Sequence, residues 1–375
     1  MQMSYELRTR VIFEQDALAE NATLITSLGS SALVVLDAHL EDTHPAIQET
    51  LFCLEYNGIH RTLYHHTRRT APNIANLEAG AALARETSVD FIVAIGGIST
   101  LETAKAIALL AAQNIDEATL LVSTIERAIP VICIPTMPGG GTEVTDEVHI
   151  AQTGLDHLTL VRNRLLLPYL ALIDPRYMAN LSEEKVIECY LHTLGRAVEA
   201  LASEKANPIS DCLGVAALGG MSDLFDSLTA TDKSMSLWHD EHLLLAANQT
   251  GLAIAMVGAN TLEALATPLT YVKEMSLGKA YGLMIPPFIA FLLDRHKVVG
   301  DVVLQSLYLP NLDALQEFLW DILGEVEPLS QAEYEQVINA AQNTPGLKNS
   351  VLSLDYKDIA SCYAHLVADT DMNQA

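Results

Sequence analysis

The first half of the chain alternates short, fully apolar runs with longer stretches whose apolar residues recur at helical spacing. Three of the apolar runs are SALVVLD at 31–37, DFIVAIGG at 90–97 and IPVICIP at 129–135. Helical spacing lies between them, at 73–88 and 100–113. Short apolar strands separated by helices are typical of a parallel sheet that is covered on both faces. The pattern therefore predicts an α/β domain with a parallel sheet for this half.

The pattern changes near the middle of the chain. A last strand and a turn are expected in YLALIDP at 169–175, and Ser182 is a suitable N-cap for the helix that follows. From there on, alanine, leucine and glutamate recur at helical spacing and strand signals are few. We predict an α/β domain at 1–180 and an all-α domain at 181–375.

Composition and charge narrow the range of partners. The chain has 375 residues, of which 50% are apolar, and its 21 basic and 47 acidic residues give a formal net charge of −26. Such a surface repels nucleic acid and anionic membranes, so we expect neither as a partner. The five cysteines form no CxxC pair and the first residues, MQMSYELRTR, form no apolar segment. Both observations favour a reducing, cytoplasmic location.

Two glycine-rich turns directly follow predicted strands. Gly96 and Gly97 precede the helix of ISTLETAKAIALL, and PTMPGGGTEVT at 135–145 follows the third apolar run. The carboxyl ends of parallel strands meet at one edge of a sheet, where ligands bind. Glycine lets the backbone approach a ligand closely, and the free N–H groups at a helix start suit a phosphate. For either turn alone, a tight turn without a ligand is an equal alternative.

A helical stretch in the second half, ECYLHTLGRAVEALAS at 188–203, carries His192 and Arg196 four residues apart. That spacing puts both side chains on one face of the helix. A histidine paired with a carboxylate or a second histidine would indicate a metal site, but a guanidinium cannot ligate a metal. The stretch alone is compatible with a metal site, a metal site that has lost ligands, or an ordinary helix.

Together these segments resemble the iron-dependent (group III) alcohol dehydrogenases of the dehydroquinate-synthase-like superfamily. The resemblance runs from about Val11 to the C-terminal helix and rests on AIGGISTLETAKAIA, PTMPGGGTEVT, ALIDP, RAVEALASEKANPISD and GLMIPP. It implies an N-terminal Rossmann-like domain that binds NAD(P), a helical domain that holds a divalent metal, and a reaction between them. It also implies a homodimer formed through the N-terminal region.

The resemblance places the family's metal ligands, an aspartate and three histidines, on His192, Arg196, Glu263 and Leu277. A further histidine linked to catalysis falls on Thr267. Leu277 has no donor atom, and Arg196 brings a fixed positive charge to the place of the cation. At ~4 Å and an effective dielectric constant near ~20, that charge opposes each unit of cation charge by about 4 kcal/mol. We therefore predict no stoichiometric iron or zinc, and a catalytic site built from His192, Arg196 and Glu263.

The cofactor half departs less from the family pattern. The resemblance assigns cofactor binding to Asp37, Gly96, Gly97, Ser99, Thr136, Gly139 and Thr145. Asp37 closes the first apolar run, where a carboxylate binds the adenosine ribose and favours NAD over NADP. Ile98 stands in place of a third glycine, Met137 and Pro138 are unusual for the family, and Leu158 replaces a lysine. The resemblance thus implies NAD binding that is weakened.

Two functions of different classes follow from these residues. The first is an NAD-dependent oxidoreductase for a small alcohol or aldehyde, in which Arg196 polarises the substrate oxygen and His192 handles the proton. Arg196 is then expected to pair with Glu263 or with an anionic substrate bearing a carboxylate or phosphate. The alternative is a non-catalytic relative that binds nucleotide or a partner. The glycine turns and Asp37 favour the enzyme, whereas the lost metal ligands favour the alternative.

Overall fold

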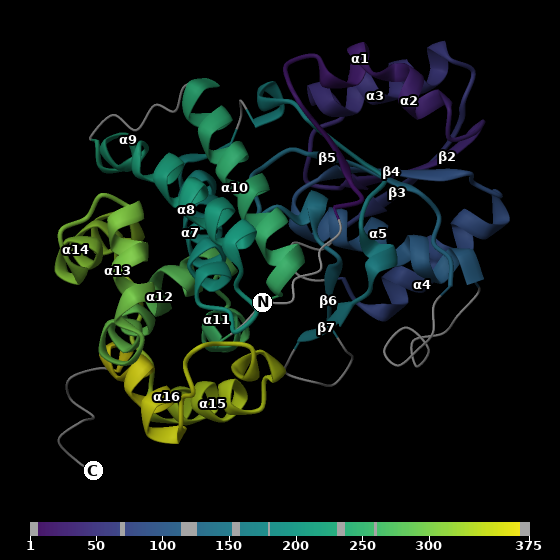
Figure 1. Cartoon of the computed structure of the whole chain (residues 1–375). Helices are drawn as coiled ribbons and strands as arrows, with labels where there is room; N and C mark the ends of the chain where they lie inside the picture. Colours follow the sequence, from purple (N-terminus) through teal and green to yellow (C-terminus); the bar gives the residue numbers. More distant parts are fainter. Residues whose placement is uncertain are drawn as a thin grey trace. The chain divides into compact units, whose positions relative to one another are not determined.

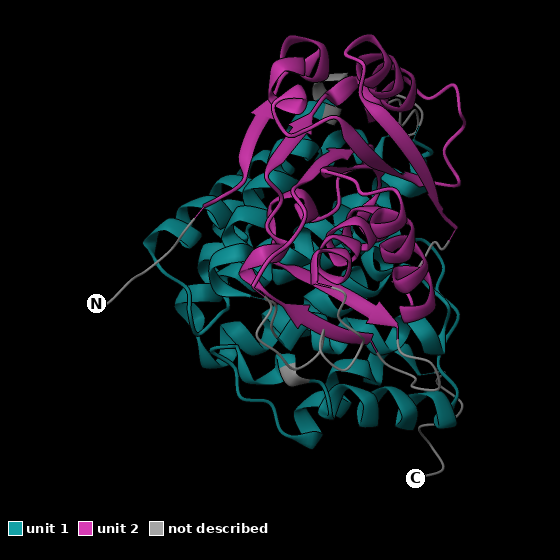
Figure 2. Cartoon of the chain, turned by 90° about the vertical axis from the view of Figure 1, so that its right-hand side faces the viewer, with its two compact units in different colours: residues 1–5, 181–375 teal, residues 6–180 magenta. Residues whose placement is uncertain are grey.

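The computed structural model describes residues 7–67, 72–113, 126–151, 158–178, 181–230, 237–258 and 261–367. The chain divides into two compact units: the first comprises residues 6–180, and the second comprises residues 181–375 together with residues 1–5 (Figure 2). All the named strands belong to the first unit, and the named elements of the second unit are helices. An α/β unit with a parallel sheet and an all-α unit are therefore both present, as the sequence predicted.

Six strands of the first unit form a parallel sheet in the order β1-β8-β5-β4-β2-β3. The strands are β1 Arg10–Phe13, β2 Ser31–Asp37, β3 His60–His66, β4 Phe91–Gly96, β5 Val131–Pro135 and β8 Leu170–Ile173. The three apolar runs of the sequence form β2, β4 and β5, which are neighbours in the middle of this sheet. Their position explains why these runs show no alternation of apolar and polar residues, since both faces of a central parallel strand are buried.

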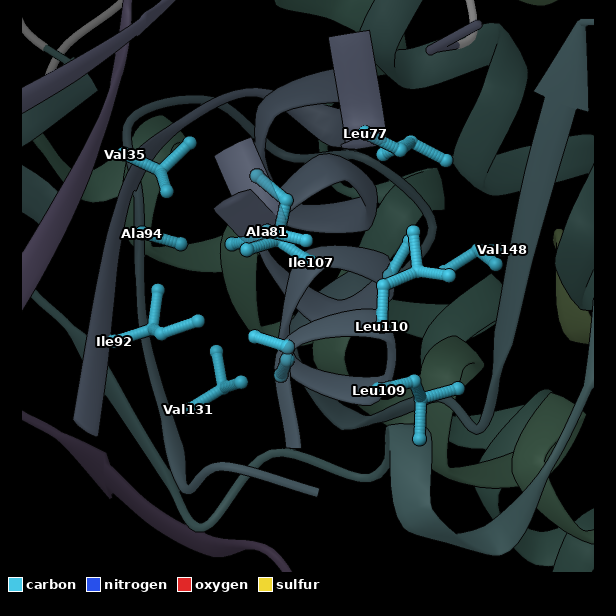
Figure 3. Packing of buried hydrophobic residues seen from close by; sticks show 14 of the residues in the cluster. Val35, Leu77, Ala81, Ile92, Ala94, Ile107, Leu109, Leu110, Val131 and Val148 are labelled. Carbon is cyan, nitrogen blue, oxygen red and sulfur yellow. The ribbon is translucent and has the colours of Figure 1, made fainter. Parts of the chain in front are cut away.

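Helices cover both faces of this sheet (Figure 1). On one side lie α1 Ala17–Glu20, α2 Ala22–Thr26 and α3 Pro45–Tyr56, and on the other α4 Ile74–Glu86 and α5 Ile98–Gln113. Successive residues of β2, β4 and β5 alternate between two apolar clusters. Figure 3 shows the cluster beneath α4 and α5, with Val35, Ile92, Ala94 and Val131 of the sheet and Leu77, Ala81, Ile107, Leu109 and Leu110 of the helices.

An antiparallel hairpin, which the sequence pattern did not predict, completes the first unit. It consists of β6 Glu147–Ala151 and β7 Leu158–Arg162. Val148 and Ile150 of β6 join the apolar cluster beneath α4 and α5. Three 3₁₀ turns, η1 Thr142–Val144, η2 Arg164–Leu166 and η3 Pro175–Met178, connect these strands to their neighbours.

The second unit is built around α7 Glu183–Leu201, which packs against α8, α10, α11 and α12. Ser182 is its N-cap, and the Ser182 side chain accepts a hydrogen bond from the Lys185 N–H, as predicted. The other helices are α8 Pro208–Ser222, α9 Phe225–Thr229, α10 Leu237–Val257, α11 Thr261–Val272, α12 Leu277–Arg295, α13 Lys297–Ser306, α14 Leu312–Leu323, α15 Gln331–Gln342 and α16 Tyr356–Tyr363, with η4 Pro345–Lys348 and η5 Ala364–Leu366.

The helix α12 is long and apolar enough to cross a membrane by length and composition alone. The core helix of a globular unit has the same properties, and 61% of the apolar window of α12 is buried inside the protein. Its neighbours are α7, α11, α13, α14 and α16. The apolar character of α12 is thus accounted for by its packing.

Candidate functional site

Polar residues of three helices gather in the core of the second unit. His192, Arg196 and Glu199 lie on one face of α7, where residues four and three apart are neighbours. Glu263 comes from the first turn of α11 and Tyr281 from α12. We call these five residues the α7 cluster. All five are buried, with exposed fractions of 7% for His192, 4% for Arg196 and 8% for Glu263.

Hydrogen bonds and an ion pair join the α7 cluster. Arg196 Nη1 lies 2.5 Å from Glu263 Oε2 and 3.8 Å from Glu199 Oε2. The Tyr281 hydroxyl donates to Glu199 Oε2 at 2.9 Å and also lies 3.4 Å from Glu263 Oε2. The backbone N–H of Glu263 donates to Glu199 Oε1 at 2.7 Å. The predicted pairing of Arg196 with Glu263 is therefore present.

Two glycines bring α12 close enough to α7 for this network to form. A Cβ atom on Gly195 of α7 would lie 2.2 Å from Cδ1 of Tyr281, so the ring occupies the space that a side chain would fill. In the first turn of α12, a Cβ atom on Gly278 would lie 2.0 Å from the carbonyl oxygen of Glu188. These close approaches place the Tyr281 hydroxyl between the two carboxyl groups.

The charges of the α7 cluster do not balance if every group is ionised. Burial, together with the negative charge of Glu263, raises the pKa of Glu199 to about 8, although Arg196 opposes part of this shift. Burial and the two carboxylates also raise the pKa of Tyr281 well above its ordinary value. At neutral pH Glu199 is therefore mostly protonated. The cluster then holds one guanidinium and one carboxylate, which form an ion pair.

The structure brings together the three residues that the sequence assigned to catalysis, His192, Arg196 and Glu263. The centroid of the His192 ring lies 5.5 Å from that of Tyr281. Thr267, one turn after Glu263, donates its hydroxyl to the Glu263 carbonyl at 2.8 Å. The catalytic role of these residues stays a prediction. Sequence reasoning did not single out Glu199 and Tyr281, because neither stands at a position where the resemblance expects a ligand.

The residues at the expected ligand positions do not fit a divalent metal. Leu277 has a hydrocarbon side chain, Arg196 has no lone pair to donate, and the Glu263 carboxylate is engaged by Arg196. Across the described residues, no group of three or more histidine, cysteine, aspartate or glutamate side chains is arranged to hold a metal ion. Iron and zinc sites normally use at least three protein ligands. At these positions the positive charge is that of the Arg196 guanidinium.

In the first unit, the two glycine-rich turns lie side by side at the carboxyl ends of neighbouring strands. Gly96 at the end of β4 pairs with Pro135 at the end of β5, and the Thr136 N–H donates to the Gly96 carbonyl at 3.1 Å. Gly96 has a φ of 154°, which favours glycine. A Cβ atom there would also lie 2.9 Å from Cβ of Asp37 and of Thr100. The predicted meeting of both turns at one sheet edge is confirmed.

Asp37, Ser99 and Thr136 surround these turns, but their contacts differ. Asp37, the last residue of β2, accepts a hydrogen bond from the His39 N–H at 2.9 Å through Oδ1. The Ser99 hydroxyl lies 3.1 Å from Nε2 of the buried His66. The Thr136 hydroxyl is buried and has no hydrogen-bond partner in the described part of the chain. The Thr136 hydroxyl is therefore better suited to a polar ligand than the Ser99 hydroxyl, which already contacts His66.

Lys105 ties α5 to the segment after the second glycine turn. Its Nζ donates to the Thr142 carbonyl at 3.1 Å, the Thr145 hydroxyl at 3.1 Å and the Glu147 carbonyl at 2.9 Å. Burial lowers the pKa of Lys105, and the nearby carboxyl groups oppose this shift. The predicted cofactor residue Thr145 is thus part of an internal support for the turn.

A carboxylate–imidazole pair that the sequence did not reveal lies next to this support. Glu102 of α5 holds His149 of β6 through Oε1 to Nδ1 at 2.8 Å and through Oε2 to the His149 N–H at 3.2 Å. The two residues are 47 positions apart, and β6 was not predicted, so no local pattern could have found them. The pair fixes the start of the hairpin to α5.

Comparisons with known proteins agree with this architecture. The model of the family described as "Iron-containing alcohol dehydrogenase" matches residues 8–175. A protein of Salmonella typhimurium named "Probable alcohol dehydrogenase EutG" is 27% identical over 226 residues, which are 59% of this chain and 56% of that protein. The NAD-dependent methanol dehydrogenase of Bacillus methanolicus is 24% identical over 283 residues, covering 75% of this chain and 73% of the relative.

A solved structure is similar over nearly the whole chain. The iron-containing alcohol dehydrogenase of Thermotoga maritima has a TM-score of 0.90 and 24% identity, and the match covers 98% of this chain and 99% of that one. At this identity the likeness shows the fold, which confirms the predicted fold class. By sequence, the chain spans little more than half the length of the first curated relative, 56%.

Proposed function

We propose that the chain is a member of the iron-containing alcohol dehydrogenase family, and that it transfers hydride between NAD and a small alcohol or aldehyde without a transition metal. The observation that carries the metal-free part is the ion pair between Arg196 and Glu263, which occupies two of the expected ligand positions. Leu277 removes a third ligand. The α7 cluster then supplies charge and proton transfer from side chains alone.

The cofactor part of the proposal rests on the sheet edge of the first unit. When bound, NAD⁺ supplies the hydride acceptor. Asp37 at the end of β2 suits the adenosine ribose and disfavours the 2′-phosphate of NADP. Thr136 offers a buried hydroxyl, and the α5 start after Gly97 offers backbone N–H groups for a phosphate. One relative, from Bacillus methanolicus, is named as NAD-dependent, which supports the same choice.

We assign the chemistry of the substrate oxygen to two residues of the α7 cluster. In alcohol oxidation His192 accepts the hydroxyl proton and Arg196 stabilises the negative charge that develops on the oxygen. Glu263 and Glu199 already surround the guanidinium, at 2.5 and 3.8 Å from Nη1. Because the Glu263 carboxylate already neutralises the Arg196 guanidinium, a carboxylate or phosphate of the substrate would gain little there, so we propose an uncharged substrate.

An assay of NADH oxidation with short aldehydes, combined with elemental analysis of the same sample, tests this function. We expect turnover that persists in a metal chelator, with substoichiometric iron and zinc. Arg196→Met should lower kcat by about 10²-fold or more, as expected when a group that stabilises an oxyanion is removed. About one tightly bound iron or zinc per chain, or activity that disappears with chelation, would refute the metal-free mechanism.

The second candidate function is a non-catalytic relative that binds nucleotide or a partner. The replacement of all four expected metal ligands favours it, because no residue of the α7 cluster is needed for nucleotide binding alone. Calorimetric titration with NAD⁺ separates the two functions. Binding without NADH oxidation across a panel of primary alcohols and aldehydes would support the non-catalytic function.

A further inference from the structure

An apolar side chain of each glycine-rich turn in the first unit packs against a glycine of the other turn. A Cβ atom on Gly139 in the second turn would lie 2.4 Å from Cγ1 of Ile98 in the first turn. Conversely, a Cβ atom on Gly97 in the first turn would lie 2.7 Å from the sulfur of Met137 in the second. Each turn therefore places one side chain in the space that a glycine of the other turn leaves open.

The glycines of these turns serve two different purposes. Gly140 and Gly141 have φ values of 61° and 78°, so their backbone conformation favours glycine whatever lies nearby. Gly97 and Gly139 are not among the residues with positive φ. At these two positions the absence of a side chain makes room for Met137 and Ile98. In a dinucleotide site, the corresponding room lets the backbone approach the pyrophosphate.

Ile98 and Met137 are also less deeply placed than the residues around them. Both are partly exposed, whereas Gly97, Thr136 and Gly139 are buried. Methionine is unbranched and adapts its shape easily, so it can leave such a position at low free-energy cost. Beside Met137, the Thr136 hydroxyl is buried with no partner among the described residues. If Met137 is displaced, the Thr136 hydroxyl can donate a hydrogen bond to an oxyanion that takes its place.

We propose that Ile98 and Met137 form a reciprocal plug over the two glycine turns, which a pyrophosphate group displaces when the dinucleotide binds. This inference rests on the proposed function, because it concerns the same cofactor site. If the plug is closed most of the time, the apparent dissociation constant is the intrinsic one divided by the open fraction. The identities of residues 98 and 137 thus set the affinity for the cofactor.

The test is calorimetric titration of the full chain with NAD⁺ and with ADP, which carries the pyrophosphate without the nicotinamide. Ile98→Ala, Met137→Ala and the double variant shorten the plug and keep the glycines. Ile74→Ala is the matched control, because Ile74, like Ile98, is a partly buried isoleucine at the first residue of a helix. We expect the double variant to bind both nucleotides at least about tenfold more tightly, a shift of about 1.4 kcal/mol. The control should bind as the unmodified chain does.

The outcomes separate the plug from the proposed function. Tight binding by the double variant and none by the unmodified chain would support the plug and refute NAD-dependent activity of the natural chain. Equal, measurable binding by both would refute the plug and leave the function standing. If neither the double variant nor the unmodified chain binds ADP or NAD⁺, both the plug and the proposed function are refuted. With the plug shortened, the two glycine turns should accept the pyrophosphate of ADP.

A second measurement tests the packing itself. Gly139→Ala should lower the midpoint of thermal unfolding in the unmodified chain, because its methyl group meets Ile98. In the Ile98→Ala background the same change should have little effect. Equal effects in the two backgrounds would show that Ile98 does not occupy the space above Gly139, and would overturn the plug.

Discussion

A carboxyl group that keeps its proton at neutral pH lies at the centre of the α7 cluster. Glu199 accepts hydrogen bonds from the Glu263 N–H and the Tyr281 hydroxyl, and it is 0% exposed. Its pKa is about 8 in the folded chain against an ordinary value of 4.5. Below pH 4.5, Glu199 is protonated whether or not the chain is folded. Between pH 4.5 and a pH of about 8, the folded chain holds a proton on Glu199 that the unfolded chain has released.

The free energy of unfolding should therefore fall as the pH rises through this window. From pH ~6 to pH ~8 the loss due to Glu199 is on the order of 2 kcal/mol, at about 1.4 kcal/mol per pH unit. Glu199→Gln resembles the protonated side chain and should remove this pH dependence. Urea unfolding of the two proteins at both pH values measures it, with Glu317→Gln, an exposed glutamate in α14, as the control. A variant with the same slope as the unmodified chain would contradict the assignment.

At the scale of helices, Gly278, unlike Gly195, faces backbone atoms of the other helix where α7 and α12 meet. A Cβ atom on Gly278 would meet the backbone carbonyl of Glu188, which cannot move aside as a flexible side chain can. Because this contact places Tyr281 of α12 beside the carboxyl groups of the α7 cluster, the packing of two helices and the polarity of the site are linked.

Gly278→Ala should lower the free energy of unfolding by about 3 kcal/mol, the cost of forcing a group into a packed interface. Gly220→Ala is the matched control, since Gly220 lies in α8 with nothing within 4 Å of the added atom. There the better helix propensity of alanine should stabilise the chain by ~0.5–1 kcal/mol. Denaturant unfolding of both variants gives the comparison. Equal effects would show that the α7–α12 contact is looser than the geometry indicates.

At the scale of the whole molecule, local apolar patterns predicted the elements better than the contacts between them. The strands β2, β4 and β5 could be predicted because each is a short apolar run that is buried on both faces. The hairpin β6–β7 could not, since polar residues interrupt its strands, Glu147 and His149 in β6 and Thr159 and Arg162 in β7. The resemblance to the family singled out His192, Arg196 and Glu263, and these residues do lie together in the α7 cluster. The contacts of Ile98 with Gly139 and of Met137 with Gly97 join residues distant in sequence, and no periodicity encodes them.

The ion pair of Arg196 with Glu263 also means that the two residues are not equally easy to replace. Arg196→Ala leaves the buried carboxyl groups of Glu263 and Glu199 with no cation of the α7 cluster beside them. Glu263→Ala leaves Arg196 with Glu199 at 3.8 Å, whose proton can depart to restore an ion pair. Arg196→Ala should accordingly lower the thermal unfolding midpoint more than Glu263→Ala, and the reverse ranking would contradict this. Anyone engineering a metal site into this chain should therefore replace residue 263 before residue 196, because the reverse order passes through the less stable single variant.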